Sequence, residues 1–121
     1  MKNTILVVED NELNMELVRD ILKLGKYRVL EAVDAETGIS LAREHHPDLI
    51  LMDIQLPGMD GLSACRIIKK DVKLADVPIV VLTSHAMSGD EEKARAAGCS
   101  GYLTKPIDTR SFLKEIDQNL K

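Results

Sequence analysis

The sequence predicts an α/β domain in which five parallel strands alternate with five helices. Two observations support this fold class. Short continuous apolar runs recur along the chain, and such runs are typical of strands that are covered on both faces. Stretches with the spacing of amphipathic helices separate these runs, and this alternation produces parallel sheets with right-handed crossovers. Because 121 residues suit one domain with a sizeable core, we expect residues 1–121 to form a single domain.

The first strand and helix occupy the N-terminal part of the chain. Thr4–Val8 is predicted as a strand, and a helix follows over about Glu12–Leu24. Asn11 can cap the start of this helix, and Gly25 can end it. The apolar residues expected on one helix face are Leu13, Leu17, Ile21 and Leu24, with Val18 and Leu22 beside them.

The next strand–helix unit leads into the most apolar strand. Tyr27–Ala32 is the second predicted strand. Asp34 then caps a helix that runs to about His46, where Pro47 stops it. Leu49–Asp53 is the third strand, and its unbroken apolar character indicates a central position in the sheet.

The second half of the chain repeats the pattern. A loop rich in Pro and Gly follows the third strand. The elements expected after it are an amphipathic helix marked by Leu62, Cys65 and Ile68, a strand over Ile79–Thr83, a helix over about Asp90–Ala97, a strand over Gly101–Thr104, and a last helix over about Asp108–Leu120 with Phe112, Ile116 and Leu120 inward. The fourth of these five helices has little apolar area to bury, so we expect it to be among the less stable parts.

Composition restricts the possible functions. The apolar share is 45%, the charged share 30% and the net charge −4, with Lys and Arg scattered, so no nucleic-acid footprint is present. No apolar run approaches the ~20 residues that span a bilayer, and the N-terminus shows no signal peptide. We therefore expect a cytoplasmic protein that neither inserts into membranes nor binds nucleic acid by itself. Cys65 and Cys99 have no metal-ligand spacing, which predicts free structural thiols, with a redox role as the alternative.

Chemically active side chains stand at the ends of four predicted strands. Glu9 and Asp10 end the first strand, Asp53 the third, Thr83 the fourth, and Lys105 follows the fifth. Because the carboxyl ends of parallel strands share one edge, these groups should converge in one cleft. Three close carboxylates repel unless a hard cation is bound, and Mg²⁺ suits carboxylates together with phosphate oxygens. An aspartate there can act as a nucleophile that forms an aspartyl-phosphate.

Four stretches resemble, in the expected order, the motifs of the response-regulator receiver family of two-component signalling. They read ILVVEDNELN, PDLILMDIQLPGMDGL, PIVVLTSHA and GYLTKPID. The resemblance covers essentially the whole chain. It implies the flavodoxin-like (βα)₅ fold, a doubly wound five-stranded parallel sheet with strand order 2-1-3-4-5.

The resemblance also implies a role for each site residue. Asp53 would be the phosphorylated aspartate, and Mg²⁺, or Mn²⁺ in its place, would bind directly to Asp10, through water to Glu9, and to the backbone carbonyl of Gln55 as well as to Asp53. The remaining implied roles are a switch hydroxyl at Thr83, a phosphate-binding lysine at Lys105, a switch aromatic at Tyr102, a cis peptide bond before Pro106, and tuning of the phosphorylated lifetime by Gln55 and His85.

By the same resemblance, the protein is a switch and not a turnover enzyme. A sensor histidine kinase or a histidine phosphotransferase would supply the phosphoryl group, and the protein would catalyse only its own phosphorylation and dephosphorylation. Modification would shift a conformational equilibrium, and the fourth helix, fifth strand and last helix would present the output face to a downstream effector that the sequence does not name.

Three other functions stay open from the sequence. A phosphohydrolase similar to the haloacid-dehalogenase family needs an acid two residues after its nucleophile, where this chain has Gln55. A nucleotide-binding module needs a glycine-rich first loop, whereas the loop that starts at Glu9 is acidic and lacks glycine. A degenerate receiver used as a scaffold is the third possibility, and the complete set of strand-end residues argues against it.

Overall fold

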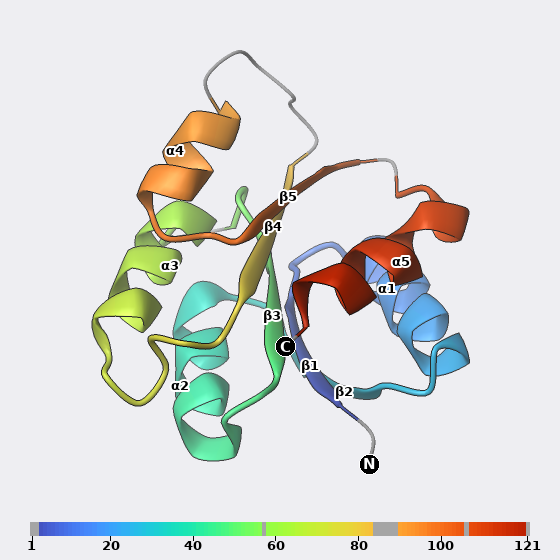
Figure 1. Cartoon of the computed structure of the whole chain (residues 1–121), viewed down its shortest axis with the longest axis horizontal. Coiled ribbons are helices and arrows are strands. Elements are labelled where there is room, and N and C mark those ends of the chain that lie inside the picture. Colours follow the sequence, from blue (N-terminus) through green and yellow to red (C-terminus); the bar gives the residue numbers. More distant parts are fainter. Residues whose placement is uncertain (1–2, 57, 84–89, 106, 121) are drawn as a thin grey trace.

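The computed structural model describes residues 3–56, 58–83, 90–105 and 107–120. Strands and helices alternate throughout these segments, as the apolar pattern predicts (Figure 1). The elements are β1 (Thr4–Val8), α1 (Glu12–Leu24), β2 (Arg28–Ala32), α2 (Ala35–His45), β3 (Leu49–Asp53), α3 (Gly61–Lys70), β4 (Ile79–Thr83), α4 (Asp90–Ala96), β5 (Gly101–Thr104) and α5 (Thr109–Asn119). Within the described residues, none of these helices is long and apolar enough to cross a bilayer.

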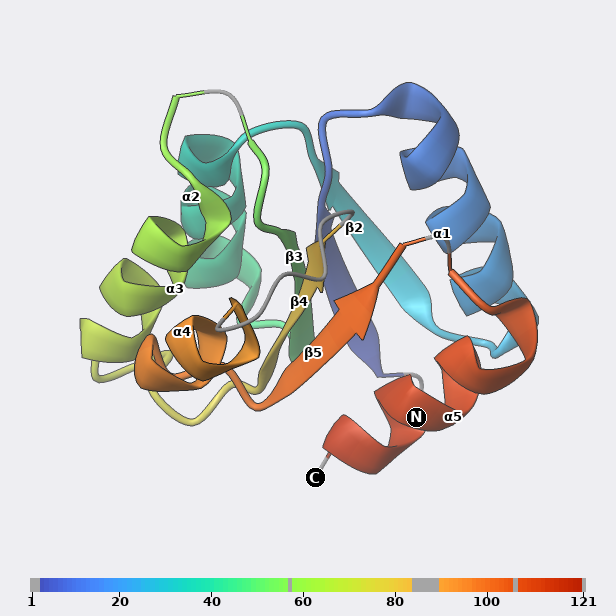
Figure 2. The ribbon, with the colours of Figure 1, turned by 90° about the horizontal axis from the view of Figure 1, so that it is seen from above.

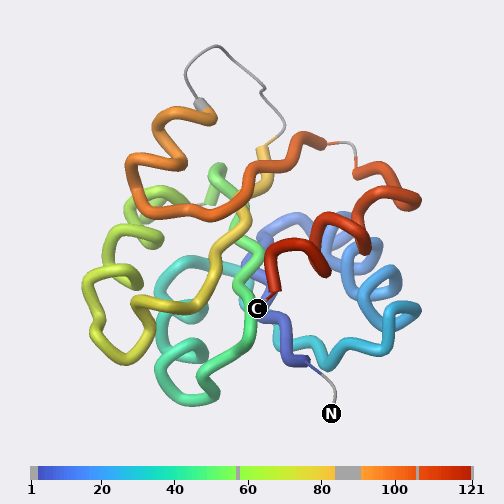
Figure 3. The backbone as a smooth tube through the Cα atoms, in the orientation of Figure 1, coloured from blue at the N-terminus to red at the C-terminus, as the bar shows by residue number. Residues whose placement is uncertain are grey.

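The five strands form one parallel sheet in the order β2-β1-β3-β4-β5, which confirms the expected flavodoxin-like topology. Figure 2 shows α2, α3 and α4 on one side of the sheet and α1 and α5 on the other. The backbone trace in Figure 3 crosses between these layers after α1 and again after α4. Since α1 and α2 lie on opposite faces, the strand order reverses between β1 and β3, and a crevice opens there at the carboxyl ends of the strands.

The sheet separates two apolar cores. Alternate residues along each strand point to opposite faces, so one core forms under α2, α3 and α4 and the other under α1 and α5. Every residue of β3 and β4 is buried, as expected for strands covered on both faces. The central strands therefore form a rigid base whose polar residues stand only at the carboxyl edge.

The buried face of α1 differs from the predicted one. Leu13 and Leu24 are 76% and 80% exposed, and Leu17 is 40% exposed. The residues that pack onto the sheet are Met15, Val18, Ile21 and Leu22. At about 100° per residue, the three exposed leucines lie roughly a third of a turn from the buried set, so α1 carries two apolar stripes and buries only one.

Most predicted helix ends agree with the structure. The side chains of Asn11 and Asp34 accept hydrogen bonds from backbone amides in the first turns of α1 and α2. His46, predicted as the end of α2, is its cap in a left-handed conformation with φ 48°, and its Nε2 lies 2.6 Å from the carbonyl oxygen of Lys73. Tyr27 was predicted to open β2, but the strand begins at Arg28.

Candidate functional site

Three carboxylates meet at the switch point between β1 and β3. Val8 and Met52 are register partners, so the residues that follow them, Glu9 and Asp53, lie side by side at the sheet edge. Carboxylate oxygens of Glu9, Asp10 and Asp53 all lie within 4.8 Å of one another. Glu9 and Asp53 are buried, with 1% and 2% exposure, whereas Asp10 is exposed.

Lys105 reaches this cluster from the end of β5. Its Nζ lies 3.0 Å from Oδ2 of Asp53 and 2.9 Å from Oε1 of Glu9. The base of the side chain is fixed, because the Lys105 amide donates to the carbonyl oxygen of Thr83 at 2.7 Å. One ammonium group thus bridges two buried carboxylates from a strand that lies two positions from β3 and three positions from β1 in the sheet.

The charges of this cluster perturb one another. Burial, and then the adjacent Asp53 carboxylate, raise the pKa of Glu9, and contacts with Lys105 and the Asn11 amide offset this only in part. Burial alone lowers the pKa of Lys105, but its contacts with Glu9 and Asp53 outweigh that effect, so its pKa is raised. The site thus favours the charged form of Lys105, and this single ammonium does not fully offset the effect of burial and of Asp53 on Glu9.

The buried carboxylates share one cation. Glu9 Oε1 lies 2.9 Å from Lys105 Nζ, and the same ammonium also contacts Asp53. The other oxygen of Glu9, Oε2, accepts from the Asn11 amide at 3.1 Å. Three carboxylates with a single ammonium among them form an oxygen-rich donor set that fits a hard divalent cation.

The loop after β3 is held close to the end of that strand. Asp53 Oδ1 accepts a hydrogen bond from the Gln55 amide at 3.0 Å, and the Gly61 amide donates to the carbonyl oxygen of Ile54 at 3.0 Å. A Cβ atom on Gly61 would collide with the carbonyl oxygen of Asp53. Only glycine therefore lets α3 begin at this distance, and the loop in turn fixes the Asp53 carboxylate.

A cleft of about 340 Å³ opens over the cluster. Its lining contains five predicted site residues, which come from the ends of β1, β3 and β5 and from the loop after β3, together with two asparagines that the sequence did not indicate as site residues. These lining residues are Glu9, Asp10, Asn11, Asn14, Asp53, Gln55 and Lys105. Asn14 lies in the first turn of α1. The sequence feature that could have identified it as a cleft residue is its spacing from Asn11, since residues i and i+3 share a helix face.

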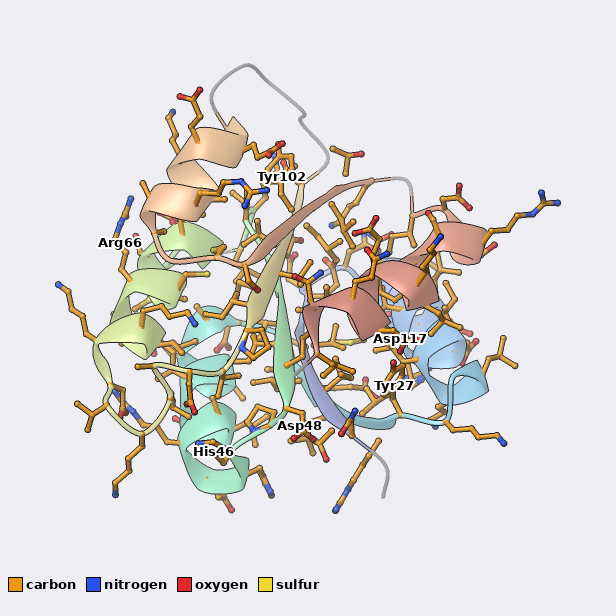
Figure 4. All side chains as sticks on the ribbon, in the orientation of Figure 1. Tyr27, His46, Asp48, Arg66, Tyr102 and Asp117 are labelled. Atoms are coloured by element: carbon orange, nitrogen blue, oxygen red, sulfur yellow. The ribbon has the colours of Figure 1, made fainter. Side chains whose placement is uncertain are left out.

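Thr83 and Tyr102 lie on one face of the sheet next to this cleft. Thr83 is buried at the end of β4. It lies two residues after Val81 and therefore points to the same face of the sheet, on which α3 packs. Tyr102 is the register partner of Val81 and contacts the same core, on the side of α4 (Figure 4). Neither residue lines the cleft itself. Two further predictions fall outside the described residues: the tuning role of His85 and the cis peptide bond before Pro106.

Comparison with known proteins agrees with this geometry. The family model of the response regulator receiver domain matches residues 5–117. The polar-differentiation response regulator DivK of Brucella ovis is 44% identical over 120 residues, which cover 99% of this chain and 98% of that protein.

Solved structures give the same result for the fold and add a magnesium example. The chemotaxis protein CheY4 of Vibrio cholerae superposes with a TM-score of 0.94 at 24% identity and covers 99% of this chain and 100% of its own. The receiver domain of the sensor histidine kinase PA1611 from Pseudomonas aeruginosa has a TM-score of 0.91 at 34% identity, with 98% of both chains covered. That domain holds a magnesium ion coordinated in its active site cleft.

The matched family model, the relative and the convergent strand ends all lead to one conclusion. This chain belongs to the response regulator receiver domain family and is a phosphorylation-dependent switch of two-component signalling.

Proposed function

We propose that Asp53 is the residue that accepts the phosphoryl group. The observation that carries this proposal is the position of its carboxylate, which is buried at the floor of the cleft with Lys105 Nζ 3.0 Å away. Glu9 shares the Lys105 ammonium, but burial and the Asp53 carboxylate raise its pKa, which favours its protonated, non-nucleophilic form, and Asp10 is exposed at the rim. Asp53 is therefore the carboxylate that combines a fixed orientation with an adjacent cation for an incoming anion.

The residues that would hold Mg²⁺ are Glu9, Asp10, Asp53 and the backbone carbonyl of Gln55, and Mn²⁺ can replace it because it prefers the same oxygen ligands. The bound cation would neutralise charge on the phosphoryl oxygens during transfer. The 4.8 Å cluster of carboxylates, two of them buried and sharing a single ammonium, supports this assignment. Asp10 would bind the cation directly, and Glu9 would act through water.

The reaction is an in-line transfer from a phosphohistidine. A carboxylate oxygen of Asp53 forms a bond to phosphorus while the bond from phosphorus to the imidazole nitrogen breaks, and the imidazole keeps that electron pair. The Gln55 amide, 3.0 Å from Oδ1, orients the carboxylate for attack. Lys105 then exchanges its ion pair with Asp53 for one with a phosphoryl oxygen.

The switch residues are Thr83 and Tyr102. The Thr83 hydroxyl would donate to the phosphoryl group from the end of β4, one position beyond Leu82, the register partner of Asp53. Tyr102 lies on the neighbouring strand β5, opposite Val81 and on the same face of the sheet as Thr83, and it would turn inward as Thr83 moves. The change would reach the face made by α4, β5 and α5, and Pro106 with its proposed cis bond would aim Lys105 at the cleft.

The phosphoryl donor is a protein, namely a sensor histidine kinase or a histidine phosphotransferase in the cytoplasm. Exposed Leu13 and Leu17 on α1 support a protein donor, because Leu13 stands beside the acidic residues that rim the cleft. The domain, residues 1–121, would catalyse only its own phosphorylation and dephosphorylation. An effector protein would read the modified form, without nucleic acid or membrane contact by this domain.

A small phosphodonor tests the proposal without a partner. With acetyl phosphate and Mg²⁺, intact-mass spectrometry should detect one added phosphoryl group on the wild-type protein and none on Asp53→Asn. Asp60→Asn is the matched control, because Asp60 caps α3 outside the cleft and this variant should still be labelled. Labelling of Asp53→Asn at the wild-type level would assign the wrong nucleophile, and continuous release of phosphate from varied monoesters would indicate a phosphohydrolase.

The lifetime of the modified form tests the two tuning positions. Gln55 and His85 would control how easily water reaches the acyl phosphate, so Gln55→Ala and His85→Ala should each change the dephosphorylation rate without abolishing labelling. A lifetime unchanged in both variants would remove them from this role.

A further inference from the structure

The two cysteines that the sequence separates lie in contact inside the molecule. Cys65 is on α3 and Cys99 is in the turn between α4 and β5. Both are free and buried, both belong to the core under α2, α3 and α4, and a hydrogen bond between the two thiols is the largest influence on the pKa of each. The sulfur atoms are therefore neighbours, which is the first requirement for a disulfide.

The turn that carries Cys99 is held against α3 by its backbone. Gly98 adopts a φ of +98°, and a Cβ atom there would lie only 2.8 Å from Cγ of Lys69 on α3. The Cys99 amide donates to the carbonyl oxygen of Ala94 at 3.0 Å, and the Ser100 amide donates to that of Ile79 at 2.8 Å. The contact between the thiols thus follows from a fixed turn and is not a chance approach of two loops.

The environment makes the two thiols chemically unequal. The hydrogen bond from Cys65, together with the positive charges of Lys69 and Arg66, lowers the pKa of Cys99 despite its burial. The same hydrogen bond, and burial after it, raise the pKa of Cys65. Arg66 extends from α3 beside α4 (Figure 4). Cys99, which is 6% exposed against 0% for Cys65, is accordingly the thiol that an oxidant meets first.

We propose that Cys65 and Cys99 are a redox-active dithiol that closes to an intramolecular disulfide in the presence of a peroxide. The Cys99 thiolate attacks one peroxide oxygen, the O–O bond breaks, and the departing oxygen leaves as water after taking a proton, which gives a sulfenic acid. The Cys65 sulfur then attacks the Cys99 sulfur, the S–O bond breaks, and the Cys65 proton completes a second water. Two thiols are oxidised and one hydrogen peroxide is reduced.

Access to the pair depends on α4. This helix has seven residues, and Ala94 and the following Ala97 contribute only methyl groups to the core. Segments with few buried apolar contacts open locally at low free-energy cost, so the turn at Cys99 can expose its thiol without global unfolding. Disulfides in a reducing compartment are typically transient and redox-sensing, which fits a bond that closes and reopens.

The disulfide would join α3 to the turn before β5. If the proposed function holds, this bond would restrain the α4 and β5 part of the output face and oppose the change that phosphorylation drives. The chemistry of the thiols itself needs no phosphoryl donor. A failure of Asp53 labelling would therefore leave the disulfide proposal intact, and the reverse is also true.

Hydrogen peroxide added to the folded full-length chain tests the proposal. The expected result is an intact mass lower by two hydrogens, loss of both alkylatable thiols, a crosslinked peptide pair containing Cys65 and Cys99, and full reversal by dithiothreitol. Retention of both thiols in the native protein, or crosslinks only between molecules, would overturn it.

Single variants and melting provide the controls. Cys65→Ala should leave Cys99 to gain oxygen as a sulfenic acid, more slowly than in the wild-type protein because the hydrogen bond from Cys65 is lost, whereas Cys99→Ala should leave Cys65 unreactive until the chain unfolds. Circular dichroism confirms that each variant is folded.

The oxidised wild-type protein should melt roughly 10 °C higher than the reduced form, because the disulfide restricts the unfolded chain. Equal reactivity of the two single thiols, or a lower melting temperature after oxidation, would contradict the account.

Discussion

Among single residues, Lys105 has the largest electrostatic role. Its ammonium bridges Glu9, which follows β1, and Asp53, which is the last residue of β3. Its side chain is only 13% exposed, so solvent screens these contacts weakly. Lys105 therefore offsets the repulsion between the two carboxylates in the metal-free fold, and in the proposed mechanism it would also receive the incoming anion.

Lys105→Met should destabilise the metal-free protein by about 2–3 kcal/mol, below the usual cost of breaking a fully enclosed pair because the cleft is open. Urea unfolding with a chelator measures this loss, and the variant should also label slowly with acetyl phosphate. Lys114→Met, at an exposed position of α5, is the matched control and should change stability by less than about 0.5 kcal/mol. Equal effects of the two substitutions would contradict the bridging role.

Glu9 gives the site a pH dependence. Its pKa is raised in the folded state, so its contribution to stability is complete below the ordinary value of 4.5 and is lost as the pH rises through the raised value. In metal-free solution, Glu9→Gln should therefore gain stability relative to wild type across that interval. The unfolding free energies of the wild-type protein and of Glu9→Gln, measured between pH 4 and 8, should diverge as the pH rises through this interval and then differ by a constant amount.

Magnesium provides the control for this pH prediction. Mg²⁺ at millimolar concentration should stabilise the wild-type protein and reduce the advantage of Glu9→Gln, because binding requires the ionised carboxylate. A constant difference between the two proteins over the whole pH range would show that Glu9 titrates normally.

At the scale of elements, the start of α3 fixes the position of Asp53, the proposed acceptor. Gly61→Ala should cost about 2–4 kcal/mol, because the new methyl group must displace the backbone of Asp53. Gly58→Ala is the comparison, since Gly58 has open space around it and only a positive φ of 73° to strain, worth about 1 kcal/mol.

Chemical denaturation of both glycine variants measures the difference, and labelling with acetyl phosphate should be impaired more in Gly61→Ala. A similar loss of stability in the two variants would mean that the approach of α3 to β3 is not tight.

Helix α1 shows where apolar periodicity reaches its limit. Leu13, Leu17 and Leu24 have helical spacing, and nothing in the sequence ranks them below the stripe that is buried. The choice is made by tertiary packing, because the helix must present one face to both the sheet and α5. The strand ends were more predictable, since a parallel sheet allows only one edge for their carboxyl termini.

The buried stripe of α1 can be checked by truncation. Leu22→Ala should destabilise the protein by about 2–5 kcal/mol, whereas Leu24→Ala should change stability by less than about 0.5 kcal/mol. Thermal melting of the two variants gives the comparison. A larger cost at Leu24 would place the wrong face of α1 against the sheet.

For the whole molecule, the order 2-1-3-4-5 brings together residues that the chain separates, and Asp53 and Lys105 contact each other across 52 positions. That convergence follows from strand ends alone, so the sequence predicts it. The raised pKa of Glu9 and the contact between Cys65 and Cys99 cannot be predicted in this way, because they depend on side-chain packing and desolvation that no spacing encodes.

The central claim is that Asp53 carries the phosphoryl group, and locating the modification tests it most directly. Protein treated with acetyl phosphate and Mg²⁺ would be reduced with borohydride, which converts an acyl phosphate to an alcohol, and then digested and sequenced by tandem mass spectrometry. We expect the reduced residue at position 53 and unmodified carboxylates at Glu9 and Asp10. Reduction at either of those two residues, with position 53 unchanged, would contradict the account.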